Sequence, residues 1–308
     1  MVAIVGPTAS GKARLAAAAA RAAGLPLLSC DSMKVYRGLD VGTAKPPAEL
    51  REGLEWRGID VADPWESFDA RRFVALFEEC LAEARAAGRP LLLSGGTMLY
   101  LKAATEGLAD APPRSPDVRA RLEAEAVAEG SPALHRRLVE LDAPTAARVH
   151  PNDLRRIVRA LEVHEVSGRP LSSFHGQFGA VRCDITRTVL RVARERPDMD
   201  RRIDERVERM IGAGWADECE ALLGDPRGIS PEARQALGYR QLFEWLAAGR
   251  SGSSARDAVV ARIQTATRRF ARRQLTWLRK LPDVEVLSTH ERQDPTEHLG
   301  RVLAALDR

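Results

Sequence analysis

The stretch Val2-Ala-Ile-Val5, followed at once by Gly6-Pro-Thr-Ala-Ser-Gly-Lys-Ala13, decides the fold class of this 308-residue chain. A short apolar run, a glycine-rich loop and the alanine-rich stretch 14–23 predict a strand, a tight loop and a helix. In such a loop the glycines let backbone N–H groups turn inward, the helix start adds partial positive charge, and the lysine supplies a point charge. The stretch therefore predicts a phosphate-binding loop.

The position after the loop lysine departs from the usual pattern. A serine or threonine normally stands there and its hydroxyl ligates Mg²⁺, whereas this chain has Ala13. A plain strand-to-helix turn is the alternative interpretation. The strand before the loop and the helix after it favour the phosphate-binding interpretation, with one metal ligand missing.

Short apolar strands alternate with helical segments through the first hundred residues, which predicts a parallel sheet that binds ligands at the carboxyl ends of its strands. After Pro112 the patterns are helical, almost without strand candidates until Thr186–Ala193. We expect an α/β fold, a P-loop-type parallel sheet flanked by helices, over 1–112 and 174–308, with an inserted all-helical subdomain at 113–173. The predicted early strands are Val2–Val5, Pro26–Ser29, Gly58–Val61 and Pro90–Ser94.

The bulk composition, with 44% hydrophobic and 29% charged residues, is that of an ordinary globular protein. No apolar run approaches the roughly 18 residues that a membrane span needs, and Met1 leads directly into the first predicted strand. We therefore expect a cytoplasmic protein without a targeting peptide or membrane contact, and a monomer. Four widely spaced cysteines predict free thiols rather than a zinc site.

One segment near the C-terminus carries most of the positive charge. Residues 251–281 hold eight Arg and Lys residues against one aspartate, or +7, so the rest of the chain carries 4 − 7 = −3. A solvated charged face is the ordinary interpretation, but acidic residues at i±4 are nearly absent, which favours a polyanion-binding helix over 254–281. Its predicted buried stripe is Val259, Ile263, Ala266, Phe270, Trp277 and Leu281.

Other predicted strand ends carry side chains suited to chemistry beside the loop. Asp31 closes the second predicted strand and is a candidate base, a candidate Mg²⁺ ligand or an Asx cap of the following turn. Thr97 follows Gly95-Gly96 and offers a hydroxyl at a helix start or simply caps that helix. Lys45 is predicted to reach an anion in the same cleft.

Seven segments, in order, are similar to one known family. They are Gly6–Lys12, Asp31–Tyr36, Asp40–Pro46, Gly95–Tyr100, His150–Asp153 with Arg159–Val163, Gly238-Tyr239 and Arg272–Arg279. Together they resemble the tRNA dimethylallyltransferases of bacterial type. The resemblance implies transfer of a dimethylallyl group from dimethylallyl diphosphate to the N6 amine of the adenosine 3′-adjacent to the tRNA anticodon, releasing diphosphate, with Mg²⁺ as cofactor.

The resemblance also implies roles for individual residues. Asp31 would be the general base, within a catalytic set completed by Thr8, Lys12 and Thr97. The diphosphate would lie against Gly6, Pro7, Thr8, Ala9, Ser10, Gly11, Lys12 and Ala13. The insertion would contact the anticodon stem-loop, and the implied tRNA-binding residues are Asp31, Ser32, Met33, Lys34, Thr97, Arg119, Arg155, Arg156, Arg159, Arg268, Arg269, Arg272, Arg273 and Gln274.

Departures from the family pattern leave some points open. Ala13 leaves Mg²⁺ to Ser10 or Asp31, directly or through water, and Lys34 stands where glutamine is common. The alternative functions are a P-loop nucleotide or small-molecule kinase, which gives no role to the basic helix, and a non-catalytic RNA-binding protein with a decayed loop.

Overall fold

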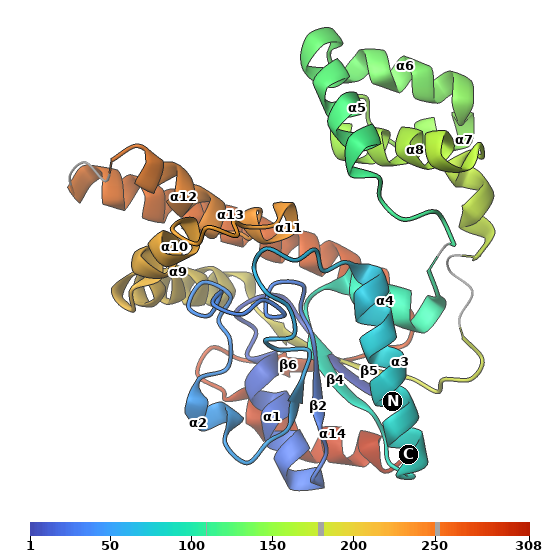
Figure 1. The fold of residues 1–308 in the computed structure, drawn as a ribbon. Coiled ribbons are helices and arrows are strands. Elements are labelled where there is room, and N and C mark those ends of the chain that lie inside the picture. Colours follow the sequence, from blue (N-terminus) through green and yellow to red (C-terminus); the bar gives the residue numbers. More distant parts are fainter. Residues whose placement is uncertain (109, 178–181, 250–252) are drawn as a thin grey trace. The chain divides into compact units, whose positions relative to one another are not determined.

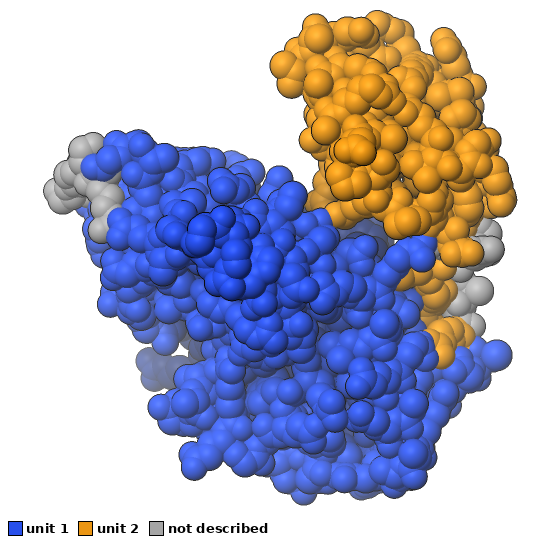
Figure 2. Space-filling view, in the orientation of Figure 1, with its two compact units in different colours: residues 1–104, 183–308 blue, residues 105–182 orange. Residues whose placement is uncertain are grey.

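The computed structural model describes residues 1–308 except 109, 178–181 and 250–252 (Figure 1). The chain divides into two compact units, the first formed by Met1–Ala104 with Cys183–Arg308 and the second by Thr105–Arg182 (Figure 2). The boundaries expected from the turn-rich sequence, at 113 and 173, both lie inside the second unit.

The first unit contains a sheet that, within the described residues, has six strands paired in parallel in the order β3-β2-β4-β1-β5-β6. The expected α/β fold with a parallel sheet is thereby confirmed. The register aligns the ends of three strands, because Gly95 pairs with both Val5 and Cys30. The strands are β1 (Val2–Val5), β2 (Leu27–Cys30), β3 (Trp56–Arg57), β4 (Leu92–Gly95), β5 (Thr188–Arg194) and β6 (Val284–Thr289).

Helices cover both faces of this sheet, and β1 is fully buried as a central parallel strand requires. Val2 and Ile4 pack into one core with α1 and α14, while Ala3 and Val5 face the other core with α3 and α4. The helices of this unit are α1 (Lys12–Ala23), α2 (Ala48–Arg51), α3 (Ala70–Ala86), α4 (Met98–Glu106), α9 (Arg196–Gly212), α10 (Trp215–Leu223), α11 (Pro231–Arg234), α12 (Tyr239–Ala247), α13 (Ser253–Leu278), η2 (Pro295–His298) and α14 (Leu299–Leu306).

The third strand is shorter and earlier than the sequence predicts. The prediction of a strand over Gly58–Val61 is wrong, because β3 ends at Arg57. Gly58 and Asp60 have φ of 74° and 57°, which turns the chain out of the extended conformation. A Cβ at Gly58 would also stand 2.9 Å from the carbonyl oxygen of Ser29. The strand β6 and the helix α10 were not predicted at all.

The buried face of α13 also differs from the predicted stripe. Val259 and Ile263 are buried as expected, but Phe270 and Trp277 are 36% and 45% exposed. The residues buried in this half of the helix are instead spaced three or four apart, and two of them are polar. They are Thr267, Ala271, Gln274 and Leu278. A prediction based on apolar residues alone is therefore wrong about the buried face in the second half of this helix.

The second unit is a small helical bundle. Its helices are α5 (Pro116–Glu129), α6 (Ser131–Leu141), α7 (Ala143–Ala146), α8 (Leu154–Ser167) and η1 (Leu171–Gln177). Helix α8 begins after Asp153, whose carboxylate accepts the Arg156 N–H, and it buries Ile157, Val158 and Leu161 in the bundle core. In neither unit is any described helix long and apolar enough to cross a membrane.

Candidate functional site

The phosphate loop joins β1 to α1 in a conformation that needs its small residues. Gly11 and Ala9 have φ of 90° and 65°, in the left-handed region where an ordinary side chain is strained. A Cβ at Gly6 would lie 2.7 Å from Ser10 Oγ and 2.9 Å from the Val192 carbonyl oxygen. The loop therefore packs tightly on the end of the sheet, which suits the predicted backbone cradle.

Lys12 curls over this loop. Its Nζ donates to the Pro7 carbonyl at 3.2 Å and would lie 3.5 Å from a Cβ at Gly96, at the end of β4. Burial, together with the nearby ammonium of Lys34, lowers the pKa of Lys12 to about 7, against the opposing effect of Asp31. An arriving anion would favour the charged form of Lys12 again.

Three arginines that the sequence analysis missed hold the loop from the far side. Arg194 Nε donates to the Ser10 carbonyl and Arg202 Nε to the Ala9 carbonyl, each at 3.1 Å. Arg206 Nη2 donates to Thr8 Oγ1 at 2.6 Å. Arg202 and Arg206 lie four residues apart on α9, a spacing that places them on one face. That spacing is the only sequence signal for them.

Arg206 has one N–H group that is not used in a hydrogen bond within the described part of the chain. This group is its Nε, which is buried. Burial, with the neighbouring Arg209, lowers its pKa to about 10. An unpaired donor of a buried guanidinium is costly unless an acceptor meets it, so this N–H is available to an anion beside Thr8.

Asp31 follows β2 and lies among these cations. Its Oδ1 accepts the N–H groups of Met33 at 2.9 Å and Lys34 at 3.3 Å, so the Asx-cap interpretation is confirmed for that oxygen. No hydrogen bond to Oδ2 is present in the described residues. The charge of Asp31 interacts with those of Lys12, Lys34 and Arg206. Capping therefore orients the carboxylate and leaves one oxygen available for chemistry.

Thr97 ties the end of β4 to the Asp31 turn. Its Oγ1 accepts the Ser32 N–H at 3.0 Å, and its own N–H donates to the Cys30 carbonyl at 3.2 Å. Gly95, two residues earlier, has no room for a side chain, because a Cβ there would lie 1.9 Å from the Cys30 carbonyl oxygen. The two strand ends are thus held in close contact, with Thr97 positioning the turn that contains Asp31.

Gln274 brings α13 into the same site. Its Oε1 accepts the Thr8 N–H at 2.8 Å and its Nε2 donates to the Gly96 carbonyl at 2.9 Å. The side chain is only 7% exposed. The resemblance places Gln274 among the tRNA contacts, whereas here its amide bridges the two glycine loops.

The donor set for a metal ion is thin. Ser10 is fully buried and its hydroxyl faces Gly6, while the Thr8 hydroxyl accepts from Arg206. Ala13 offers no oxygen, and no cluster of three acidic, His or Cys ligands exists among the described residues. Of the two candidate ligands, Asp31 has one oxygen without a described hydrogen bond, whereas Ser10 is fully buried.

Two of the recognised motifs serve as scaffold. Gly42 and Gly238 flank the indole of Trp215, which a Cβ at either glycine would overlap at 2.1 or 2.0 Å. The Glu218 carboxylate accepts the N–H of Val41 at 2.8 Å and bonds the Tyr239 hydroxyl. These contacts fix the 40–46 loop on α10 and α12.

The prediction that Lys45 reaches a ligand anion is wrong. Its side chain is only 2% exposed, and its Nζ forms ion pairs with the side chains of Asp40 and Asp60, both at 2.5 Å. Its partners are therefore internal carboxylates, which stabilise the fold of the loop.

The basic half of α13 presents unpaired charge. Arg269, Arg272 and Arg273 are exposed, and none has an ion-pair partner in the described part of the chain; we call these three the α13 basic surface. Two other arginines of the helix are paired across the fold, Arg262 with Glu244 and Arg268 with Asp204. The exposed ring of Phe270 lies 5.8 Å from the Arg273 guanidinium carbon.

The arginines of the second unit are mostly engaged. Glu162 is fully buried and accepts from Arg119 at 3.0 Å and Arg159 at 2.8 Å. Arg156 pairs with Asp153 at 3.3 Å. Arg155 is exposed without a described partner.

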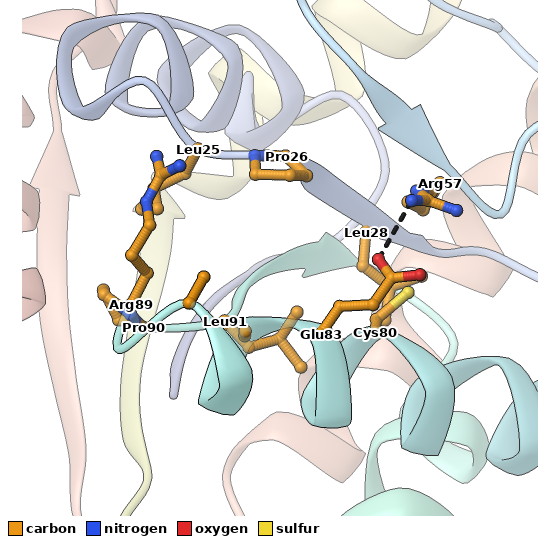
Figure 3. Close-up of a pocket in the computed structure, with 11 residues that line it drawn as sticks. Leu25, Pro26, Leu28, Arg57, Cys80, Glu83, Arg89, Pro90 and Leu91 are labelled. Carbon is orange, nitrogen blue, oxygen red and sulfur yellow. Dashed lines mark hydrogen bonds and ion pairs between the residues drawn. The ribbon is translucent and has the colours of Figure 1, made fainter.

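A separate cavity of about 170 Å³ lies beside the amino ends of β2 and β4, where Leu25, Pro26 and Leu91 line it (Figure 3). The phosphate loop lies at the opposite, carboxyl ends. Burial raises the pKa of its Cys80 thiol to about 11, which disfavours a thiolate, and Arg57 in its wall pairs with Glu83. This cavity therefore lacks the charged cluster found at the loop.

A phosphate loop, a capped carboxylate and a neighbouring basic helix define a class: α/β proteins of P-loop type that handle a phosphate-bearing ligand beside a polyanion-binding surface. The chain belongs to the family described as IPP transferase, whose family model matches residues 34–281. The resemblance seen in the seven sequence segments is thereby confirmed.

Individual relatives agree with this assignment. The chain is 43% identical over 308 residues to the tRNA dimethylallyltransferase of Thioalkalivibrio sulfidiphilus (strain HL-EbGR7), covering 99% of this chain and 94% of that protein. The crystal structure of the tRNA isopentenylpyrophosphate transferase of Bacillus halodurans is similar with a TM-score of 0.67 and 33% identity, over 99% and 96% of the two chains. A eukaryotic dimethylallyltransferase acting on tRNA shares the fold at 24% identity and a TM-score of 0.77, over 94% and 73%.

Proposed function

We propose that this protein is a tRNA dimethylallyltransferase, which moves a dimethylallyl group from dimethylallyl diphosphate to the N6 amine of the adenosine 3′-adjacent to the anticodon. The main observation behind this proposal is that the phosphate loop, several basic side chains and the Asp31 carboxylate lie together at one edge of the sheet. A kinase also uses such a loop, but it leaves the α13 basic surface without a role.

The loop side of the site suits the leaving group. When the bond between the allyl carbon and the diphosphate oxygen breaks, the electron pair stays with the diphosphate. Backbone N–H groups of the loop, Lys12 and the orphaned Nε of Arg206 can stabilise that charge. The loop backbone is already held in position by Arg194 and Arg202, which donate to the Ser10 and Ala9 carbonyls.

Asp31 suits the other half of the reaction. As the adenine nitrogen forms its bond to the allyl carbon, it must lose one proton, and the carboxylate oxygen not used for capping can accept it. An exocyclic amine is a weak nucleophile, and removal of this proton during the attack makes its nitrogen more reactive. Loss of the proton also leaves a neutral product. Thr97 acts through this turn by binding the Ser32 N–H.

Mg²⁺ fits the site as an ion held mainly by diphosphate and water. Mg²⁺ commonly keeps several waters in proteins, so the Asp31 carboxylate would contact the ion through water, and its uncapped oxygen would stay free to accept the proton. When bound, the ion would neutralise charge on the departing diphosphate.

The RNA side of the proposal rests on α13. Arg269, Arg272 and Arg273 can neutralise backbone phosphates, and the exposed rings of Phe270 and Trp277 can stack on unpaired bases. The target adenine must leave its stack to meet Asp31. In the second unit, Arg155 is available for RNA as it stands, while Arg119 and Arg159 would first have to leave Glu162.

The test uses the purified protein with labelled dimethylallyl diphosphate, Mg²⁺ and unmodified tRNA, and measures prenylated adenosine. Asp31→Asn is the sharpest variant, because an amide oxygen can still accept the Met33 and Lys34 N–H groups while the base is lost. We expect a rate loss of roughly 10² to 10⁴ with unchanged thermal stability.

Three outcomes would contradict the proposal. Full turnover by Asp31→Asn removes the general-base role. Phosphoryl transfer from ATP without prenylation identifies a kinase. Binding of tRNA with no product under any donor concentration identifies a non-catalytic RNA-binding protein.

A further inference from the structure

The ammonium of Lys34 is a cation without a partner inside the proposed donor site. The backbone of Lys34 is fixed on both sides, because its N–H donates to Asp31 Oδ1 and its carbonyl accepts the Asp60 N–H at 3.2 Å. Its side chain is half-buried, and in the described part of the chain its Nζ has no hydrogen-bond or ion-pair partner. A lysine that merely stabilised the turn would not need a charge there.

The charged neighbours of Lys34 include Asp31 and Arg206 of the phosphate site, besides Arg51 and Lys45. Its charge interacts with those of Asp31 and Arg206, and it is the foremost charged neighbour of Lys12. Three basic side chains, those of Lys12, Lys34 and Arg206, thus surround a single carboxylate, that of Asp31, and outnumber it by two when all are charged. Like charges brought together in a partly buried site are unfavourable without a counter-ion. The arrangement is complete only when a multivalent anion is present.

The phosphate loop lacks the hydroxyl group that usually holds a metal ion beside the phosphates. The hydroxyl after the loop lysine normally ligates a metal ion that neutralises phosphate oxygens, and Ala13 has none. The ammonium of Lys34 is compact and has three donors, which suits it to phosphate oxygens. Asp31 remains as one potential metal ligand.

We propose that Lys34 is a diphosphate-binding residue that replaces part of the metal charge lost at Ala13, so that this chain binds the diphosphate of its donor with little help from a divalent cation. The proposal rests on the proposed function for the identity of the donor. The sequence resemblance places Lys34 with the tRNA contacts, so the two assignments make different predictions.

The experiment measures binding of inorganic pyrophosphate by calorimetry, once in EDTA and once in Mg²⁺, with no RNA present. Wild type should bind in EDTA with an affinity close to that in Mg²⁺. Lys34→Gln should weaken binding roughly 10-fold to 100-fold in EDTA, the loss of one charge-assisted contact, and less in Mg²⁺. Lys34→Arg should retain most of the EDTA affinity.

Two further variants complete the design. Lys280→Gln removes an exposed lysine after α13 and should leave pyrophosphate binding unchanged. Ala13→Thr restores the hydroxyl and should make Mg²⁺ strengthen binding several-fold more than in wild type.

The proposal is overturned if Lys34→Gln binds pyrophosphate like wild type and loses only tRNA affinity, or if wild type fails to bind in EDTA. Prenyl transfer by the same preparations separates the two hypotheses. If Lys34→Gln forms product and binds pyrophosphate normally, the role of Lys34 is rejected and the proposed function stands. Absence of product from wild type, with binding that depends on Lys34, rejects the proposed function and leaves an anion site.

Discussion

Two arginine-rich regions, the α13 basic surface and the helices of the second unit, look alike in sequence and differ in structure. Arg269, Arg272 and Arg273 are exposed and have no ion-pair partner in the described residues. In the second unit, Arg119 and Arg159 converge on the buried carboxylate of Glu162. The first region presents charge to solvent, while the second uses charge to hold its own helices together.

The difference shows why a count of cations does not locate a polyanion surface. The charge of the basic helix predicted polyanion binding, whereas the family resemblance implied tRNA contacts for the arginines of the second unit. Carboxylates near in sequence are scarce on α13, yet Asp204 on α9 and Glu244 on α12 neutralise two of its arginines through the fold. The relevant quantity is the charge that remains after tertiary pairing.

The largest effect expected from this comparison is on the stability of the second unit. Glu162→Gln leaves two arginines facing a neutral amide in a buried place, and breaking a buried pair costs about 3–5 kcal/mol. All five tryptophans lie in the first unit. The urea midpoint measured by circular dichroism, which includes the helices of the second unit, should therefore fall. The midpoint measured by tryptophan fluorescence should change little.

The control for that prediction is Glu123→Gln. Glu123 is 55% exposed and 3.7 Å from Arg119, so its loss should cost less than about 1 kcal/mol. Equal destabilisation by the two substitutions would show that the buried carboxylate has no special role.

A smaller effect is expected on RNA binding. Arg272→Ala and Arg273→Ala should each weaken binding of an anticodon stem-loop RNA and lower the slope of log affinity against log salt by about 1. Arg262→Ala, on the same helix but paired with Glu244, should leave the slope nearly unchanged. If all three change the slope equally, tertiary pairing does not decide which arginines meet RNA.

The smallest effect concerns Lys12, a buried cation that belongs to neither class. Its pKa is about 7 in the folded protein and 10.5 when unperturbed, so between these values the unfolded chain holds the extra proton. The folded state of wild type should therefore gain about 1 kcal/mol relative to Lys12→Met as pH rises from 7 to 8.

Urea titrations of both proteins at several pH values measure this difference. Addition of pyrophosphate should abolish the gain, because the anion keeps Lys12 charged. A difference between the two proteins that stays constant with pH would show that Lys12 is charged throughout.

Much of the fold and part of the site follow from local patterns. The phosphate loop, β1 and the start of α8 at Asp153 each depend on residues within one or two turns of each other. The edge strand β6 was missed because only two of its six side chains are buried, which weakens the pattern. The α13 stripe was predicted wrongly because Gln274 is buried by hydrogen bonds rather than by apolar contact.

By itself the sequence determined the strand, loop and helix of the predicted phosphate-binding loop, since glycine conformations, helix starts and the Lys12 charge act over a few residues. Only the tertiary structure decided that Arg206 completes this site and that Glu162 engages Arg119. Such pairs lie 40 to 200 residues apart in the chain, roughly, and charges attract across any sequence separation once packing removes water between them.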